Sequence, residues 1–180
     1  MTIASAVSTA SSGPTSATPA ELLFGDLAAE LATTRRILER VPDGKADWHP
    51  HEKSMTLGRL ATHLAELPRF ARTLLETEEL DWATFEYVPR TLETTAERLA
   101  LFDAESAAMR AAVEGMTWET VGSRWVMRAG DHVILQGPRG QLLRSIGLSH
   151  MVHHRAQLGV YLRLLGVPVP GVYGPSADEA

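Results

Sequence analysis

Four stretches of this 180-residue sequence place apolar side chains three or four residues apart, and this spacing constrains the fold more than any other feature. The pattern puts the apolar residues on one face of an α-helix. Four long amphipathic helices joined by longer connections predict an all-α protein, a four-helix bundle. We expect these helices to cover residues 19–40, 56–76, 91–115 and 139–165.

Local signals set the ends of these helices. Thr18-Pro19-Ala20-Glu21 reads as a capping box with proline at the first helical position. Gly166 is a stop signal for the last helix, and Pro168 prevents its continuation. Residues 117–136 are richer in β-branched and aromatic residues, which predicts a short hairpin or an extended loop between the third and fourth helices.

Composition limits the remaining possibilities. Residues 1–17 are rich in Ser, Thr and Ala and predict a disordered tail, so we expect one domain over residues 18–180. The chain has no cysteine, which excludes disulfides, thiolate metal ligands and a cysteine nucleophile. A net charge of −5 argues against nucleic-acid binding. No apolar run is long enough to span a membrane, and no secretory signal is evident. We therefore expect a cytoplasmic protein without membrane contacts.

The last predicted helix carries three histidines within five residues, His150, His153 and His154. A helix advances about 100° per residue, which places His154 about 40° from His150, within the same apolar stripe. His153 falls at the edge of that stripe. Two neutral imidazoles at positions i and i+4 can chelate one divalent ion.

A third ligand would have to come from a facing helix, and His63 is the one further histidine on an apolar stripe. Three neutral imidazoles would leave coordination positions open to water or substrate, as in catalytic sites. Such a donor set accepts nickel, zinc, copper or iron with modest discrimination. The alternative is that these are hydrogen-bonded core histidines, because a single histidine on an apolar face is more often that than a ligand.

Three other residues are candidates for the same site. Glu66 lies one turn after His63 and would act as a general base or a supporting carboxylate, unless it is simply exposed. Gln157 would contact a ligand or lie at the edge of the bundle. Tyr161 would reach the site with its hydroxyl or cap the core.

The opposite face of the last helix is uncharged and consists mostly of small residues. Such a face predicts close packing against another helix, and the same helix of a second subunit would give a two-fold homodimer. The alternative is packing by the C-terminal tail. The residues concerned are Ser145, Leu148, Val152, Ala156 and Gly159.

The sequence resembles the DinB-like (damage-inducible) superfamily of four-helix bundles. The resemblance rests on "LGRLATHLAEL", "SHMVHHRAQLGVYLRLLG" and "VYGPSADE", and it covers essentially the whole chain after the N-terminal tail. It implies a dimer that binds one divalent metal ion, often nickel or zinc, through His63, His150 and His154. It also implies, for some relatives, thiol-dependent transferase or isomerase activity with low-molecular-weight thiols such as bacillithiol or mycothiol.

We therefore expect a metal-dependent enzyme that acts on a small molecule, with a thiol-dependent S-transferase as the leading hypothesis. The absence of cysteine fits a nucleophile that comes from solution. The alternatives are a metal-dependent hydrolase, with Glu66 as the base, and a non-enzymatic metal-binding stress-response protein.

Overall fold

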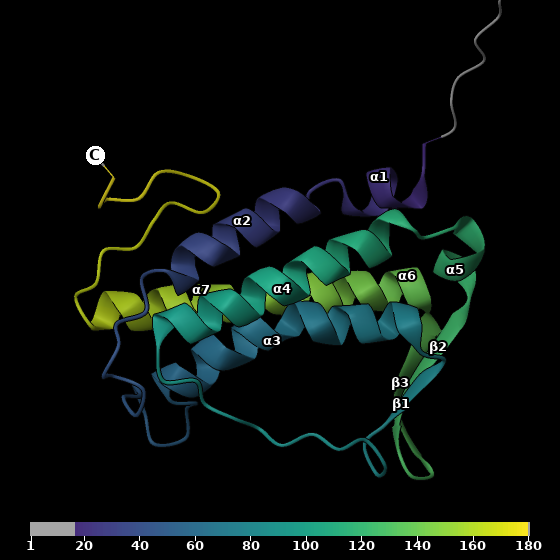
Figure 1. Cartoon of the computed structure of the whole chain (residues 1–180), viewed down its shortest axis with the longest axis horizontal. Coiled ribbons are helices and arrows are strands. Elements are labelled where there is room, and N and C mark those ends of the chain that lie inside the picture. Colours follow the sequence, from purple (N-terminus) through teal and green to yellow (C-terminus); the bar gives the residue numbers. More distant parts are fainter. Residues whose placement is uncertain (1–16, 180) are drawn as a thin grey trace, which may run out of the picture.

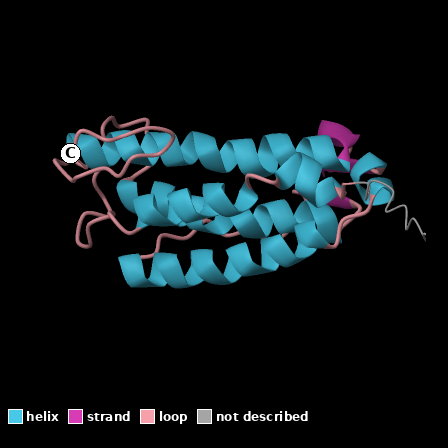
Figure 2. Cartoon of the chain, turned by 90° about the horizontal axis from the view of Figure 1, so that it is seen from above, coloured by secondary structure: helices cyan, strands magenta, loops and turns pink. Residues whose placement is uncertain are grey.

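A computed structural model describes residues 17–179, so the predicted tail over residues 1–17 lies almost entirely outside the described residues. Four helical rods run side by side, and the fourth is built from three consecutive segments (Figures 1 and 2). The rods are α2 (Leu27–Leu38), α3 (Leu57–Glu76), α4 (Thr95–Glu114), and α6 (Arg139–Leu142), η1 (Leu143–Ser149) and α7 (His150–Leu164). Two short helices, α1 (Pro19–Phe24) and α5 (Trp118–Gly122), lie at one end of the bundle.

The all-α prediction is wrong, because a three-stranded mixed sheet lies at the same end of the bundle (Figure 1). Strand β2 (Arg124–Ala129) pairs antiparallel with β3 (His132–Pro138), which confirms the hairpin. It also pairs in parallel with β1 (Glu79–Asp81), a partner that local sequence patterns cannot reveal. The sheet belongs to the core, since the side chain of Trp125 is fully buried.

The first predicted helix begins as expected and is then divided in two. Both hydrogen bonds of the Thr18–Glu21 capping box are present. The helix breaks at Gly25 and Asp26, so α1 and α2 replace one helix over residues 19–40. The carboxylate of Asp26 accepts two hydrogen bonds from Arg144, each 2.7 Å long, which ties this break to the fourth rod.

The second and third helices begin at side-chain caps. The Thr56 hydroxyl accepts a hydrogen bond from the Arg59 amide, so α3 starts at Leu57. Helix α4 starts at Thr95 rather than near residue 91, because Thr94 and Glu97 form a complete capping box. Before this box, the Leu92 amide donates to the Thr62 hydroxyl of α3 at 2.9 Å.

The fourth rod is not a uniform α-helix. Residues Leu143–Ser149 form a π-helix, which adds a residue to each turn and alters the register that the helical-wheel argument assumed before His150. Gly147 lies in this segment and packs against Ala71 of α3, where an added Cβ would lie 3.1 Å from the Ala71 Cβ. The rod ends as predicted: Gly166 has φ +71°, and the Val167 amide bonds to the Leu162 carbonyl.

The C-terminal tail returns along α2 and α7 (Figure 1) and is anchored by a buried arginine. Arg155 is 1% exposed and pairs with Glu30 of α2 at 2.6 Å. The Tyr173 hydroxyl of the tail accepts from Arg155 at 2.8 Å and donates to Glu30 at 2.9 Å. This triad holds the tail, the second helix and the last helix together.

Part of the small-residue face of the last helix is covered from within the chain. Leu148 is buried, and Gly159 approaches Val169 of the tail, as the alternative interpretation held. Ser145 and Ala156 remain exposed. The homodimer stays a prediction. Within residues 17–179, no helix combines the length and the apolar character needed to cross a membrane.

Candidate metal centre

The three histidines that the sequence singled out lie together inside the bundle. His63 comes from α3, while His150 and His154 come from successive turns of α7. One ring nitrogen of each lies within 4.8 Å of the others, so the group could hold a metal ion. The ring centroids are 4.6 Å apart for His150 and His154, and 4.7 Å apart for His63 and His154. Two helices that are far apart in the sequence thus supply one cluster.

The hydrogen bonds of the two α7 histidines aim their remaining nitrogens at the same point. The Nδ1 atom of His154 lies 2.7 Å from the Gln157 Oε1 atom, and the Ile146 carbonyl lies near the other nitrogen of the His150 ring. If these nitrogens carry the protons, both Nε2 atoms are left with lone pairs, and they face each other at 2.8 Å. Two lone pairs at this distance repel unless a cation lies against both.

Burial keeps the imidazoles uncharged. It lowers the pKa of His63 to about 4, with further contributions from His154 and Arg59. Burial also lowers the pKa values of His150 and His154. A neutral imidazole is the form that binds metal, so the free protein presents its donors already deprotonated at neutral pH.

The donor set fits a divalent transition-metal ion. Imidazole nitrogen suits zinc, nickel, copper and iron, and a ligating histidine characteristically donates its other ring N–H to a carbonyl or carboxylate. Gln157 fills that supporting role for His154, and the Ile146 carbonyl lies near the His150 ring. Gln157 was predicted either to contact a ligand or to lie at the edge of the bundle, and the structure places it behind His154 as an orienting acceptor.

Glu66 lies beside this cluster, in a network of its own. Its carboxylate pairs with Arg59 at 3.3 Å and with Arg90 at 3.4 Å, and it accepts from the Tyr87 hydroxyl at 3.1 Å. Among the described residues, none of its hydrogen bonds goes to a histidine. The role of Glu66 as a base stays a prediction.

Two further candidates lie away from the cluster. The Tyr161 hydroxyl donates to the Met55 carbonyl at 3.2 Å, and its ring meets Trp48 edge-on, so it closes one end of the core. His153 is exposed on the outer side of α7, although its ring lies 4.9 Å from that of His154. This neighbour therefore serves as a natural control for the three inward histidines.

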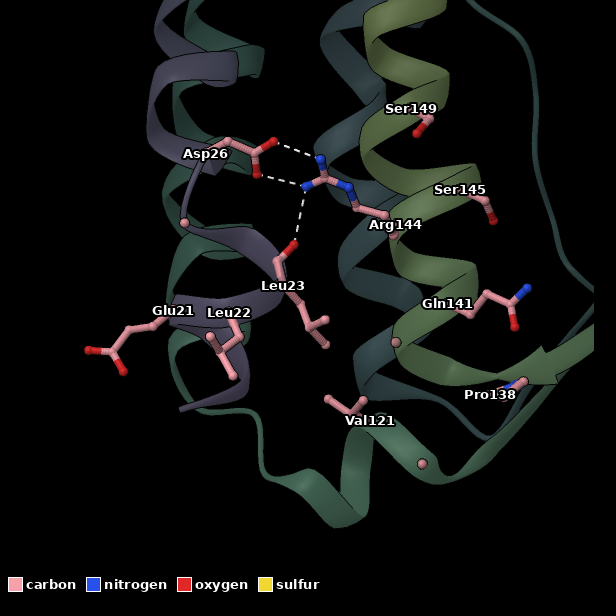
Figure 3. A pocket seen from close by; sticks show the side chains of 13 residues that line it. Glu21, Leu22, Leu23, Asp26, Val121, Pro138, Gln141, Arg144, Ser145 and Ser149 are labelled. Atoms are coloured by element: carbon pink, nitrogen blue, oxygen red, sulfur yellow. Dashed lines mark hydrogen bonds and ion pairs between the residues drawn. The ribbon is translucent and has the colours of Figure 1, made fainter. Parts of the chain in front are cut away.

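A broad hollow of about 910 Å³ lies at the end of the bundle that carries α1 and α5 (Figure 3). Its arginine, Arg144, is already engaged by Asp26 and by the Leu23 carbonyl. Ser145 and Ser149 lie on the side of the helix turned away from that pair (Figure 3). No cluster of metal-ligating side chains lies among the described residues that line this hollow. The histidine cluster is therefore the candidate site.

Sequence reasoning missed the residues that surround the cluster. Arg59 meets Glu66 from within α3, while Tyr87 and Arg90 meet it from a segment that has no regular structure. The one available signal was the density of aromatic residues between positions 82 and 87 in an otherwise polar connection.

A four-rod bundle with a mixed sheet at one end and three inward histidines defines a class of helical proteins with a candidate metal site in the core. The family to which the chain belongs follows from its sequence: it is a member of the DinB family, whose model matches residues 14–180. The resemblance inferred from the helix motifs is thereby confirmed.

Individual proteins resemble the chain in sequence or in fold. The chain is 27% identical to the uncharacterized protein YrdA of Bacillus subtilis (strain 168) over 150 residues, covering 83% of this chain and 85% of that protein. Its fold is similar to the crystal structure of a DinB-like protein from Bacillus cereus ATCC 10987, with a TM-score of 0.62, 19% identity and coverage of 84% and 95% of the two chains. A DinB-like protein from Bacillus subtilis, YjoA, gives a TM-score of 0.59 at 19% identity, with coverage of 79% and 90%.

Proposed function

We propose that this protein is a metal-dependent thiol S-transferase acting on a small electrophilic molecule, with His63, His150 and His154 as the metal ligands. The single observation that carries the proposal is the pair of Nε2 atoms of His150 and His154 facing each other at 2.8 Å beside His63. When bound, a divalent cation would supply positive charge that lowers the pKa of a thiol or water. Nickel and zinc are the ions that we favour.

The chain's own residues contribute orientation and exclusion of water. Gln157 fixes the His154 ring, and burial holds all three rings in the neutral state that ligation needs. Three histidines leave coordination positions for an exogenous ligand. The chain has no cysteine, so a sulfur nucleophile would come from a low-molecular-weight thiol.

The reaction would be a displacement at carbon. The thiol sulfur forms a bond to the electrophilic carbon, the bond to the leaving group breaks with its electron pair, and the thiol proton passes to solvent. Hydrolysis is less well supported, because both carboxylate oxygens of Glu66 are engaged by arginines, and Tyr87 donates to one of them. A base needs a free lone pair directed at the attacking water.

The test is a thiol titration of cobalt(II)-loaded protein followed by absorption spectroscopy, with 2-mercaptoethanol as the probe. We expect a sulfur-to-metal charge-transfer band that saturates at one thiol per ion, in the native protein and in His153→Ala. Stoichiometric cobalt without that band would reject thiol transfer, and hydrolysis of small esters would then be assayed. Failure to bind stoichiometric cobalt would reject every metal-dependent function.

A further inference from the structure

A cavity of about 380 Å³ opens directly beside the histidine cluster, with His63 and His150 in its lining. Helix α3 forms one wall through Leu67 and Phe70. The connection after β1 forms the other wall through three aromatic residues. Four of the chain's eleven Phe, Trp and Tyr residues line this cavity, namely Phe70, Trp82, Phe85 and Tyr87.

Backbone and side-chain hydrogen bonds hold this aromatic wall in place. The Trp82 amide donates to the Arg128 carbonyl at 2.8 Å, and the Phe85 amide donates to the Asp81 carbonyl at 2.8 Å. At the other end of the segment, the Tyr87 hydroxyl accepts from Arg59 at 2.6 Å. The segment is therefore fixed to the sheet at one end and to α3 at the other.

The aromatic side chains remain partly exposed although they touch one another. The Trp82 ring meets those of Phe85 and Tyr87 edge-on, at 5.6 and 6.1 Å. The three residues are 37 to 40% exposed, whereas most large apolar residues of the chain lie in the core. Partly exposed apolar side chains gathered around a concave opening are typical of a small-molecule pocket.

The charges around the cavity cancel. Its lining contains two acidic residues, Glu66 and Glu86, and two arginines, Arg69 and Arg90. Glu66 and Arg90 are already paired with each other at 3.4 Å. A lining with no net charge and four aromatic rings favours an uncharged, apolar ligand, and edge-to-face contacts favour one that is itself aromatic.

We propose that this cavity binds the uncharged aromatic part of the substrate and that Trp82, Phe85 and Tyr87 determine which substrates are accepted. The location of the substrate's reactive carbon rests on the proposed function, because it would lie next to His63 and His150, the two proposed metal ligands that line the cavity. Binding of the aromatic part does not require the metal ion.

The experiment measures binding of 1,3-dinitrobenzene, an uncharged aromatic molecule that has no leaving group, to chelator-treated protein by isothermal titration calorimetry. We expect one site in the native protein and an affinity lower by about 2–12-fold in Phe85→Ala, the fold-change that corresponds to about 0.5–1.5 kcal/mol for one aromatic contact. Trp118→Ala is the matched control, because Trp118 is 53% exposed on α5, away from the cavity. Glucose, a polar ring, should not bind.

Equal affinities in the native protein and Phe85→Ala, loss of affinity in Trp118→Ala, or comparable binding of glucose would each overturn the proposal. Circular dichroism of each variant checks its fold, and Phe70→Ala tests the opposite wall if Phe85→Ala is misfolded. Cobalt binding by Phe85→Ala should equal that of the native protein. Absent cobalt binding would reject the proposed function alone, and absent dinitrobenzene binding would reject the aromatic pocket alone.

Discussion

The Nε2 atoms of His150 and His154 face each other at 2.8 Å, one turn apart on α7. On its other side, the His154 ring contacts Gln157, and the His150 ring lies near the Ile146 carbonyl. If both rings carry their protons on these other nitrogens, the two Nε2 lone pairs point at each other, and His63 of α3 lies in the same cluster. In that protonation state a cation between the nitrogens would remove their repulsion, which makes the cluster a candidate for metal binding rather than a set of ordinary core histidines.

Replacing a ligand should remove the metal. We expect protein purified without a histidine tag to contain one divalent ion per chain, and His150→Ala or His63→Ala to lose it, because two imidazoles rarely retain an ion. Elemental analysis measures this directly. His153→Ala is the control and should retain the ion, since His153 is exposed. Full metal content in His150→Ala would contradict the assignment of the ligands.

Gln157 should influence the affinity for the metal ion without being a ligand itself. Replacing it with Ala removes the acceptor for the His154 Nδ1 proton and should lower metal affinity by about 10–100-fold, the usual effect of losing such a partner. Competition with a chromogenic chelator measures the change. Gln157→Glu keeps an acceptor at this position and should keep the affinity. If Ala and Glu weaken binding equally, Gln157 does not orient the ring.

The stability of the metal-free protein should fall as the pH is lowered. The folded-state pKa of His63 is about 4, against 6.5 for an ordinary histidine. Between these values the unfolded chain binds a proton that the folded chain does not, so the free energy of unfolding decreases from pH 6.5 toward pH 4. Calorimetric Tm values in the presence of chelator should follow this trend. In His63→Gln, Tm should fall less steeply as the pH is lowered. An unchanged fall in Tm would exclude His63 as a source of the pH dependence.

Arg155 should be important for stability, because it is buried and paired with Glu30. Glu30 is only 8% exposed in the native protein, and replacing Arg155 with Ala leaves its carboxylate without an arginine partner, which costs about 3–5 kcal/mol for a broken buried pair. Chemical denaturation measures the loss. The exposed pair of Arg163 and Asp178 joins the same tail, so Arg163→Ala is the control and should change stability far less. Similar losses of stability in both variants would show that the effect comes from anchoring of the tail and not from burial of the ion pair.

The predicted homodimer would form through the face of α7 that the tail leaves exposed, and this can be tested. Light scattering coupled to size exclusion should give twice the monomer mass. Ala156→Glu should shift the protein to the monomer, because it places a charge among exposed small residues. Glu119→Ala, on the short helix α5, should leave the mass unchanged. A monomeric native protein would reject the prediction.

Much of the bundle followed from local patterns. The cap at Thr18 and the stop at Gly166 act through neighbouring residues, so the chain around them contains the relevant interactions. The spacing of His150 and His154 was equally readable, because α-helical geometry places residues four apart on one face. The break at Gly25 was missed because the apolar spacing continues across it.

What the sequence alone determined is therefore the four rods of the bundle, the inward face of the paired histidines, and the choice of His63 as their partner. Tertiary structure decided the addition of β1 to the sheet, the π-helix before His150 and the aromatic wall beside His63. These features depend on contacts between distant segments, such as the parallel pairing of Leu80 with Met127 and the packing of Gly147 on Ala71. No local periodicity encodes such contacts, because their energy is gained only when the segments meet in the folded chain.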